Sequence, residues 1–172
     1  MFAAAKIPHM SSKVYVSESN LGQSVFAKTR LEPRETIFYL TGRLIDFDEA
    51  VSIPQGEYSV QIGINRYIDP WSPARYLNHS CAPNSGFVDE IRLIATRVIL
   101  PGEEIRFDYS TTMLERCWEL DCACGAPQCR GVIQDFDLLP IALQTYYLRL
   151  GIVQDFIVNE IESVKTLAAK VA

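Results

Sequence analysis

The feature that most constrains this chain is a set of three short segments in a fixed order. The first is Asn78-His79-Ser80-Cys81-Ala82-Pro83-Asn84, the second is Pro101-Gly102-Glu103-Glu104-Ile105-Arg106-Phe107-Asp108-Tyr109, and the third is Cys122-Ala123-Cys124-Gly125-Ala126-Pro127-Gln128-Cys129-Arg130-Gly131. Each segment is a weak pattern by itself, because a short motif is only a hypothesis until its context supports it. The combination is more specific, and its strength is concentrated in residues 75 to 131.

Length and composition indicate one packed domain. The 172 residues are 48% apolar and 10% aromatic, which is enough for a hydrophobic core. The apolar runs are too short to cross a membrane, and the start at Met1 lacks the basic residues of a secretory signal. The net charge of -5 argues against broad nucleic-acid binding and is compatible with a basic peptide partner. We expect an intracellular protein, cytoplasmic in a microbe, with a nuclear or host-exported location left open.

Alternating β-rich runs predict a mostly β domain. We expect strands at 14–16, 25–27, 36–40, 58–62, 66–69 and 92–99, a turn at 20–24 and a helical turn at 47–51. Short strands separated by frequent turn signals are not the pattern of a βαβ fold. After Gln134, apolar residues recur at helical spacing on both sides of Gly151, which predicts two C-terminal helices. These helices either pack on the core, which we favour, or form a dimerisation or substrate-flanking element.

The cysteine pattern predicts a metal site. Cys122, Cys124 and Cys129 place three thiols within eight residues, and a structural zinc needs four soft ligands. The chain offers four candidates for the remaining ligand, which are Cys81, Cys117, His9 and His79. We interpret Cys117 as a partly buried reduced thiol outside the site.

Together the three segments resemble the SET-domain family of protein lysine methyltransferases, including its cysteine-rich post-SET segment. The resemblance covers roughly residues 14 to 135. It implies several small sheets with a pseudoknot at the active site, to which this chain adds the C-terminal helices. We therefore divide the chain into an N-terminal tail at 1–13, a SET domain at 14–112, a post-SET zinc segment at 113–135 and a helical extension at 136–172.

The resemblance assigns roles to residues by matching motifs. It implies one structural zinc on Cys81, Cys122, Cys124 and Cys129, and S-adenosylmethionine bound beside Asn78 and His79, after the lead-in at Arg75. It implies that Tyr109 contacts the methyl donor and orients the lysine amine, and that Phe107 lines the lysine channel. Phe107 lacks a hydroxyl to hold an extra water, which suggests more than one methyl addition. Tyr58 resembles the second active-site tyrosine, with a core aromatic as an equal alternative.

Two segments depart from the family pattern. Gly22-Gln23-Ser24 stands where the family has a Gly-x-Gly turn against the cofactor, and Ser24 fits that turn only if φ is not positive. In the loop at 69–74, Trp71 either covers the cofactor or fills the core. The acidic pairs Glu103-Glu104 and Asp89-Glu90 are interpreted as solvated turns.

We expect a protein-lysine N-methyltransferase that acts on a basic, lysine-containing protein or peptide, histone-like sequences included. The alternative is a catalytically weak or inactive SET scaffold that binds peptides or proteins; the two departures keep it open, and the intact Tyr109, Asn78-His79 and cysteine set count against it. A zinc hydrolase is disfavoured because four thiolates leave no open position for water. A homodimer through the C-terminal helices stays open.

Overall fold

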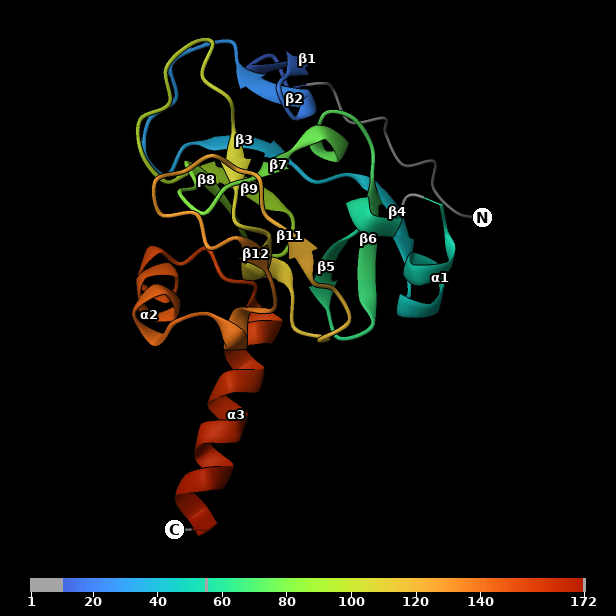
Figure 1. Cartoon of the computed structure of the whole chain (residues 1–172), viewed down its shortest axis with the longest axis vertical. Coiled ribbons are helices and arrows are strands. Elements are labelled where there is room, and N and C mark those ends of the chain that lie inside the picture. Colours follow the sequence, from blue (N-terminus) through green and yellow to red (C-terminus); the bar gives the residue numbers. More distant parts are fainter. Residues whose placement is uncertain (1–10, 55, 172) are drawn as a thin grey trace.

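The computed structural model describes residues 11–54 and 56–171 of the chain. The expectations for residues 1–10, which include most of the predicted tail and the candidate ligand His9, lie outside this part. Within it, twelve short strands form five small sheets (Figure 1). The strands are β1 (Val14–Ser19), β2 (Gly22–Ala27), β3 (Thr36–Tyr39), β4 (Gly42–Ile45), β5 (Val60–Gly63), β6 (Arg66–Pro70), β7 (Asn78–His79), β8 (Ser85–Val88), β9 (Arg92–Ala95), β10 (Arg106–Phe107), β11 (Leu120–Asp121) and β12 (Val132–Ile133).

The predicted mostly β fold with C-terminal helices is confirmed, and the deviations are local. β1 and β2 form a hairpin whose pairing continues to Gly22, so residues 22–24 belong to a strand and not to the expected turn. β9 ends at Ala95, well short of the predicted end at Ile99, because the chain then pairs only through the isolated bridge between Leu31 and Ile99. Helix α1 (Phe47–Ser52) confirms the predicted helical turn, and Asp46 caps it by accepting from the Glu49 amide.

The two central motifs meet in a two-stranded parallel sheet. β7 pairs with β10, so Asn78 lies opposite Arg106 and His79 lies opposite Phe107. The Ser80 amide then donates to the Phe107 carbonyl at 3.0 Å. Segments about thirty residues apart in the sequence are thereby held side by side. The pseudoknot threading itself stays a prediction.

The C-terminal helices extend the core, as the favoured interpretation expected. α2 (Ile141–Leu150) ends at Gly151, whose φ of 62° forms a left-handed cap, and α3 (Asp155–Val171) follows. Tyr147, Ile152 and Ile157 are fully buried in one cluster with Val88 of β8. At roughly 1.5–3 kcal/mol for each large apolar side chain, this burial anchors the extension to the β8–β9 sheet. The distal part of α3 projects away from the β-rich body (Figure 1).

Gly86 of β8 and Ile152 of the extension pack closely against each other. A Cβ placed on Gly86 of β8 would lie 2.6 Å from Cβ of Ile152. Only glycine leaves room for the chain between α2 and α3 at this point. None of the helices in the described part of the chain has the length and apolar character needed to span a membrane.

Candidate active site and metal centre

Hydrogen bonds fix Tyr109 through both its side chain and its backbone. It begins the 3-10 helix η3 (Tyr109–Thr112) directly after β10. Its hydroxyl donates to the Leu77 carbonyl at 2.7 Å, and its amide donates to Nδ1 of His79 at 3.2 Å. Burial raises the pKa of the Tyr109 hydroxyl above its ordinary value. The phenol is therefore neutral at physiological pH, and its proton is committed to Leu77.

A cavity opens beside Tyr109. Residues from several separate segments line it, among them Tyr58, Arg75, Leu77, Phe107, Tyr109 and Trp118. Its volume is about 60 Å³. At about 10–15 Å³ for each water-sized group, this space accommodates roughly four to six such groups in a row or cluster. The end of a long, unbranched side chain such as lysine fits these dimensions.

The aromatic residues that were matched to the lysine channel all face this cavity. The Phe107 ring centroid lies 4.9 Å from that of Tyr109 and 5.1 Å from that of Phe87, so its orientation is fixed by packing. Tyr58 is 45% exposed, and Arg75 stacks its guanidinium 4.8 Å from the Tyr58 ring centroid. The alternative of a core aromatic at Tyr58 is therefore wrong. The predicted strand start is also wrong, because Tyr58 ends the 3-10 helix η1 (Gly56–Tyr58).

The residues matched to the cofactor site lie around the β1–β2 turn. Nδ2 of Asn78 donates to Oγ of Ser24 at 2.6 Å and lies 3.5 Å from the Gln23 carbonyl. Gly22 has a φ of 89°, and nothing lies within 4 Å of the position where its Cβ would be. This turn thus presents open, exposed backbone next to Asn78. Arg75 lies at the cavity instead, where it donates to Asp69 at 2.9 Å.

Ser24 has an ordinary backbone and a buried side chain. It pairs with Ser17 across the hairpin and is not among the described non-glycine residues with positive φ. Its hydroxyl lies 2.7 Å from that of Ser19. The substitution of serine for glycine thus adds a polar contact and imposes no backbone strain, so this departure no longer favours the inactive alternative.

Glu104 is not solvated, which corrects the expectation for this acidic pair. Its side chain is 11% exposed, and it accepts from Nδ2 of Asn78 at 3.0 Å and pairs with Arg106. Burial would raise the pKa of Glu104, but hydrogen bonds from Arg106, Asn78 and Ser24 outweigh burial and hold the pKa below its ordinary value. Glu104 is therefore an ionised acceptor that fixes Asn78. The pair at Asp89 does lie in an exposed turn.

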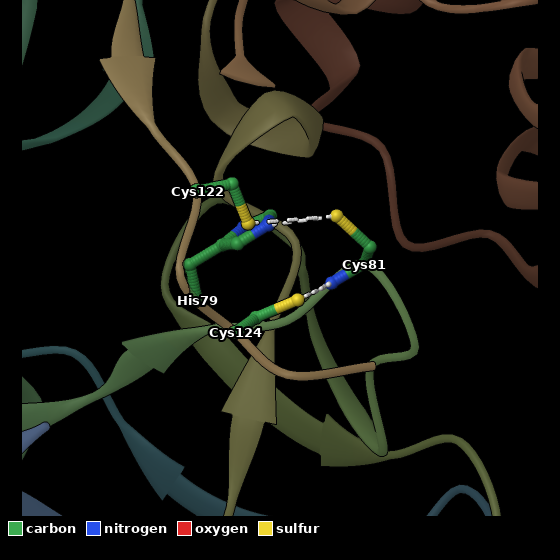
Figure 2. Close-up of side chains that lie close together, drawn as sticks. All are labelled: His79, Cys81, Cys122 and Cys124. Carbon is green, nitrogen blue, oxygen red and sulfur yellow. Dashed lines mark hydrogen bonds between the residues drawn. The ribbon is translucent and has the colours of Figure 1, made fainter. Parts of the chain in front are cut away.

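His79 is buried and neutral. Burial, reinforced by Arg130 and Arg106 and opposed by Asp108, lowers the pKa of His79 to about 4. A neutral imidazole carries one proton, and Nδ1 already accepts the Tyr109 amide, so that proton belongs on Nε2. Nε2 lies 3.3 Å from Sγ of Cys81 (Figure 2). His79 in this tautomer donates to the Cys81 sulfur and has no lone pair free for a metal.

Three of the five cysteines gather beside His79, and a fourth, Cys129, lies against Cys122. Ligand atoms of His79, Cys81, Cys122 and Cys124 all lie within 4.8 Å of one another (Figure 2). Sγ of Cys122 is 3.7 Å from that of Cys81 and 3.6 Å from that of Cys129. These residues can hold a metal ion. The fifth cysteine, Cys117, is exposed, so the expectation that it is partly buried was wrong.

The donor set fits a tetrahedral thiolate site. With metal–sulfur bonds of about 2.3 Å, the edge of a zinc–thiolate tetrahedron is about 3.8 Å, close to both sulfur–sulfur distances above. Backbone amides also point at the sulfurs, since Cys81 donates to Sγ of Cys124 at 3.5 Å and Gly131 donates to Sγ of Cys129 at 3.4 Å. Such donors stabilise thiolates. Because Nε2 of His79 carries a proton, Cys129 is the better fourth ligand.

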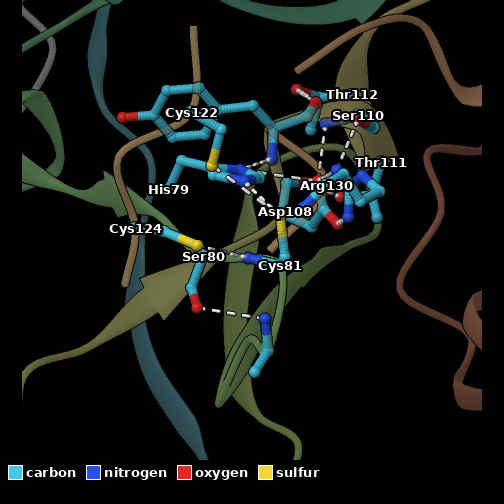
Figure 3. Close-up of polar contacts among 12 residues, drawn as sticks. His79, Ser80, Cys81, Asp108, Ser110, Thr111, Thr112, Cys122, Cys124 and Arg130 are labelled. Atoms are coloured by element: carbon cyan, nitrogen blue, oxygen red, sulfur yellow. Dashed lines mark hydrogen bonds and ion pairs between the residues drawn. The ribbon is translucent and has the colours of Figure 1, made fainter. Parts of the chain in front are cut away.

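Asp108 and Arg130 were not identified from the sequence, although both lie inside the quoted motifs. Arg130 donates to both carboxylate oxygens of the fully buried Asp108 at 2.7 and 2.9 Å (Figure 3). The buried ion pair joins the residue before Tyr109 to the residue after Cys129.

Trp71, which was expected either to cover the cofactor or to fill the core, is 54% exposed, so it does not fill the core.

These features define the class of protein. A family model described as SET domain matches residues 22–110, more than half of the chain. The chain belongs to the SET-domain family.

Individual relatives are consistent with this class. Over 137 residues the chain is 31% identical to "Histone-lysine N-methyltransferase trr" of Drosophila melanogaster and 31% identical to "Histone-lysine N-methyltransferase 2D" of Homo sapiens. Each match covers 69% of this chain, but only 6% and 2% of the two relatives. It is also 33% identical over 104 residues to "Methyltransferase flvH" of Aspergillus flavus, with 58% of each protein covered. The chain thus corresponds to a small part of the long relatives.

Proposed function

We propose that this protein transfers a methyl group from S-adenosylmethionine to the ε-amine of a lysine in a protein or peptide. The observation that carries the proposal is the cavity in which Tyr58, Phe107 and Tyr109 converge, with the Tyr109 hydroxyl directed at Leu77. Two relatives are named histone-lysine methyltransferases, which supports a protein substrate. S-adenosylmethionine supplies an electrophilic methyl group when bound.

The residues of the cavity align the amine and exclude water. The Tyr109 hydroxyl donates its proton to Leu77, so its lone pairs can accept from an amine N–H and orient the nitrogen. Because burial raises the pKa of Tyr109, the phenol does not act as a base. The lysine loses its proton to solvent before transfer. The apolar ring of Phe107 leaves no bound water in competition with methyl groups, which supports more than one addition.

The exposed backbone at Gly22 and Gln23 and the buried Ser24 beside it, together with Asn78 and His79, form the proposed cofactor site, and Arg75 and Tyr109 border it on the cavity side. Asn78 would contribute mainly backbone groups, since Ser24 and Glu104 occupy its side chain. One zinc ion on Cys81, Cys122, Cys124 and Cys129 would hold the cysteine segment against the active site. The sulfur–sulfur distances support the zinc part of this proposal, and the exposed backbone beside Asn78 supports the cofactor part.

The substrate is proposed to be a basic, lysine-containing segment, with histone-like sequences included, because the chain is acidic overall. An intracellular location and the lack of direct binding to nucleic acid and membrane are part of the same proposal. A homodimer through α2 and α3 remains a separate proposal.

Incubation of the protein with radiolabelled S-adenosylmethionine, purified histones and a whole-cell extract tests the function. We expect label in protein and, after hydrolysis, in methylated lysine. The absence of labelled lysine with every substrate, while the cofactor still binds by calorimetry, would contradict the proposal and favour a binding module.

A further inference from the structure

The buried carboxylate of Asp108 is the point at which three separate parts of the chain meet. Asp108 directly precedes Tyr109, and Arg130 of the cysteine segment donates to both carboxylate oxygens of Asp108. The Tyr147 hydroxyl, which comes from α2, donates to Oδ2 at 2.8 Å. All three side chains are buried or nearly so, with Asp108 and Tyr147 at 0% exposure. Neither metal ligation nor the role of Tyr109 explains the Tyr147 contact.

Asp108 also shapes the backbone around Tyr109. It is the N-cap of η3, and its Oδ1 accepts from the Ser110 amide at 3.2 Å. Arg130 donates to the Ser110 hydroxyl at 3.2 Å, and its own amide donates to Sγ of Cys81 at 3.4 Å (Figure 3). The orientation of this one carboxylate therefore bears on the Tyr109 turn and on the cysteine cluster together.

The helical extension braces the same turn through its backbone. The Gln154 amide donates to the Thr111 carbonyl at 3.1 Å, and the Phe136 amide donates to the Met113 carbonyl at 3.0 Å. The family match ends at residue 110, so these contacts come from a part of the chain that the family model does not cover. The extension thus contacts η3 and the residue after it through two backbone hydrogen bonds, and it contacts Asp108 through the Tyr147 hydroxyl.

We propose that Tyr147 is a positioning residue for methyl transfer. Its hydroxyl fixes the rotamer of Asp108, and the Asp108–Arg130 pair then holds Tyr109 and the cysteine segment in register. The proposal rests on the proposed function for its rate measurement, and on the cysteine cluster for a second, independent measurement. A buried carboxylate oxygen that loses one of its donors shifts to recover it, and displacements well under an ångström are costly at a reacting centre.

The test compares Tyr147→Phe with Tyr146→Phe, a matched change at the neighbouring, 54% exposed tyrosine of α2. With substrate and cofactor saturating, we expect Tyr147→Phe to lower kcat by about tenfold and leave KM within about twofold. The zinc-loaded variant should also release its metal to a colorimetric chelator several times faster. Tyr146→Phe should match the wild type in both measurements. Circular dichroism and melting curves check that each variant is folded at the assay temperature.

A double-mutant cycle with Arg130→Lys separates positioning from a general loss of packing. If Tyr147 acts through the Asp108–Arg130 pair, the double variant should be little slower than Arg130→Lys alone, because the two changes share one pathway. Equal kcat in Tyr147→Phe and wild type, or fully additive losses in the cycle, would overturn the proposal. If wild type transfers no methyl group, the proposed function fails, and metal release alone then decides: faster release from Tyr147→Phe supports the link, and equal release overturns it.

Discussion

Replacement of Cys129 by serine tests the composition of the metal site. Cys129 and His79 compete for the position of fourth ligand, and the hydrogen bond from the Tyr109 amide to Nδ1 of His79 decides between them. If Nε2 of His79 carries the proton, it donates to Cys81, and only Cys129 can complete the tetrahedron. Cys129→Ser should then impair zinc binding, whereas Cys117→Ser, at the exposed cysteine, should leave it unchanged.

The expected loss follows from the number of bonds. Structural zinc sites bind with apparent free energies of about 10–16 kcal/mol at neutral pH, which is roughly 3 kcal/mol for each of four ligands. Loss of one thiolate should therefore weaken zinc binding by about two orders of magnitude. Competition against a chelator of known affinity, with zinc counted by elemental analysis, measures this change.

X-ray absorption of the zinc-loaded wild type supplies the matching structural result. We expect four sulfur neighbours at about 2.3 Å. Three sulfurs with one nitrogen at about 2.0–2.1 Å, together with unchanged zinc affinity in Cys129→Ser, would refute the assignment and make His79 the ligand.

Three further predictions concern residues around the site and its supports. Gly86→Ala should lower the free energy of unfolding by about 1–3 kcal/mol in urea titrations, because the new Cβ would lie 2.6 Å from Ile152; an unchanged midpoint would mean that the extension does not pack on β8. Ser24→Gly restores the family residue but removes the hydroxyl that Asn78 contacts, so we expect stability to fall by about 1–3 kcal/mol with no gain in cofactor affinity, measured by calorimetry; tighter cofactor binding would contradict this account. Burial raises the pKa of Asp135 to about 6 from an ordinary value of 3.8, so the folded state binds the extra proton and the contribution of this group to stability falls as pH rises from about 4 to 6. The difference in unfolding free energy between wild type and Asp135→Asn should therefore change by up to about 3 kcal/mol across that range, and a pH-independent difference would contradict the shift.

The sequence motifs predicted which residue types form the site better than they predicted the contacts between distant segments. Cys81, Cys122 and Cys124 lie together as the motifs predicted, joined by His79, and Sγ of Cys129 lies 3.6 Å from that of Cys122; the choice of Cys129 as fourth ligand stays a prediction. The β-rich core and the helix break at Gly151 followed from periodicity and backbone preference. Both features depend on neighbouring residues only, so they can be predicted from the sequence.

The sequence did not predict the contacts between residues that are far apart in the chain. Tyr147 carries no local signal for its bond to Asp108, since one tyrosine of a Tyr-Tyr pair becomes buried only when α2 packs on the β8–β9 sheet. Glu104 looked like half of a solvated acidic turn, and its burial depends on Asn78 arriving from another segment. Tyr58 followed the composition of a strand, but the turn before Val60 placed it in a 3-10 helix at the mouth of the cavity.

Methyl transfer by wild type and Tyr109→Phe, compared across a pH series on the same labelled substrate, tests the central claim most directly. The variant keeps the ring beside Phe107 but leaves the buried Leu77 carbonyl without its donor, so stability should fall by about 1–3 kcal/mol while cofactor binding changes little. The rate should fall by about 10² or more, which corresponds to roughly 3 kcal/mol of transition-state stabilisation. In both proteins the rate should rise with pH as the substrate lysine deprotonates, and in the wild type the raised pKa of Tyr109 keeps its phenol neutral, so it adds no second titration. Equal rates in wild type and Tyr109→Phe would remove Tyr109 from the mechanism and contradict the account of this cavity as a methyl-transfer site.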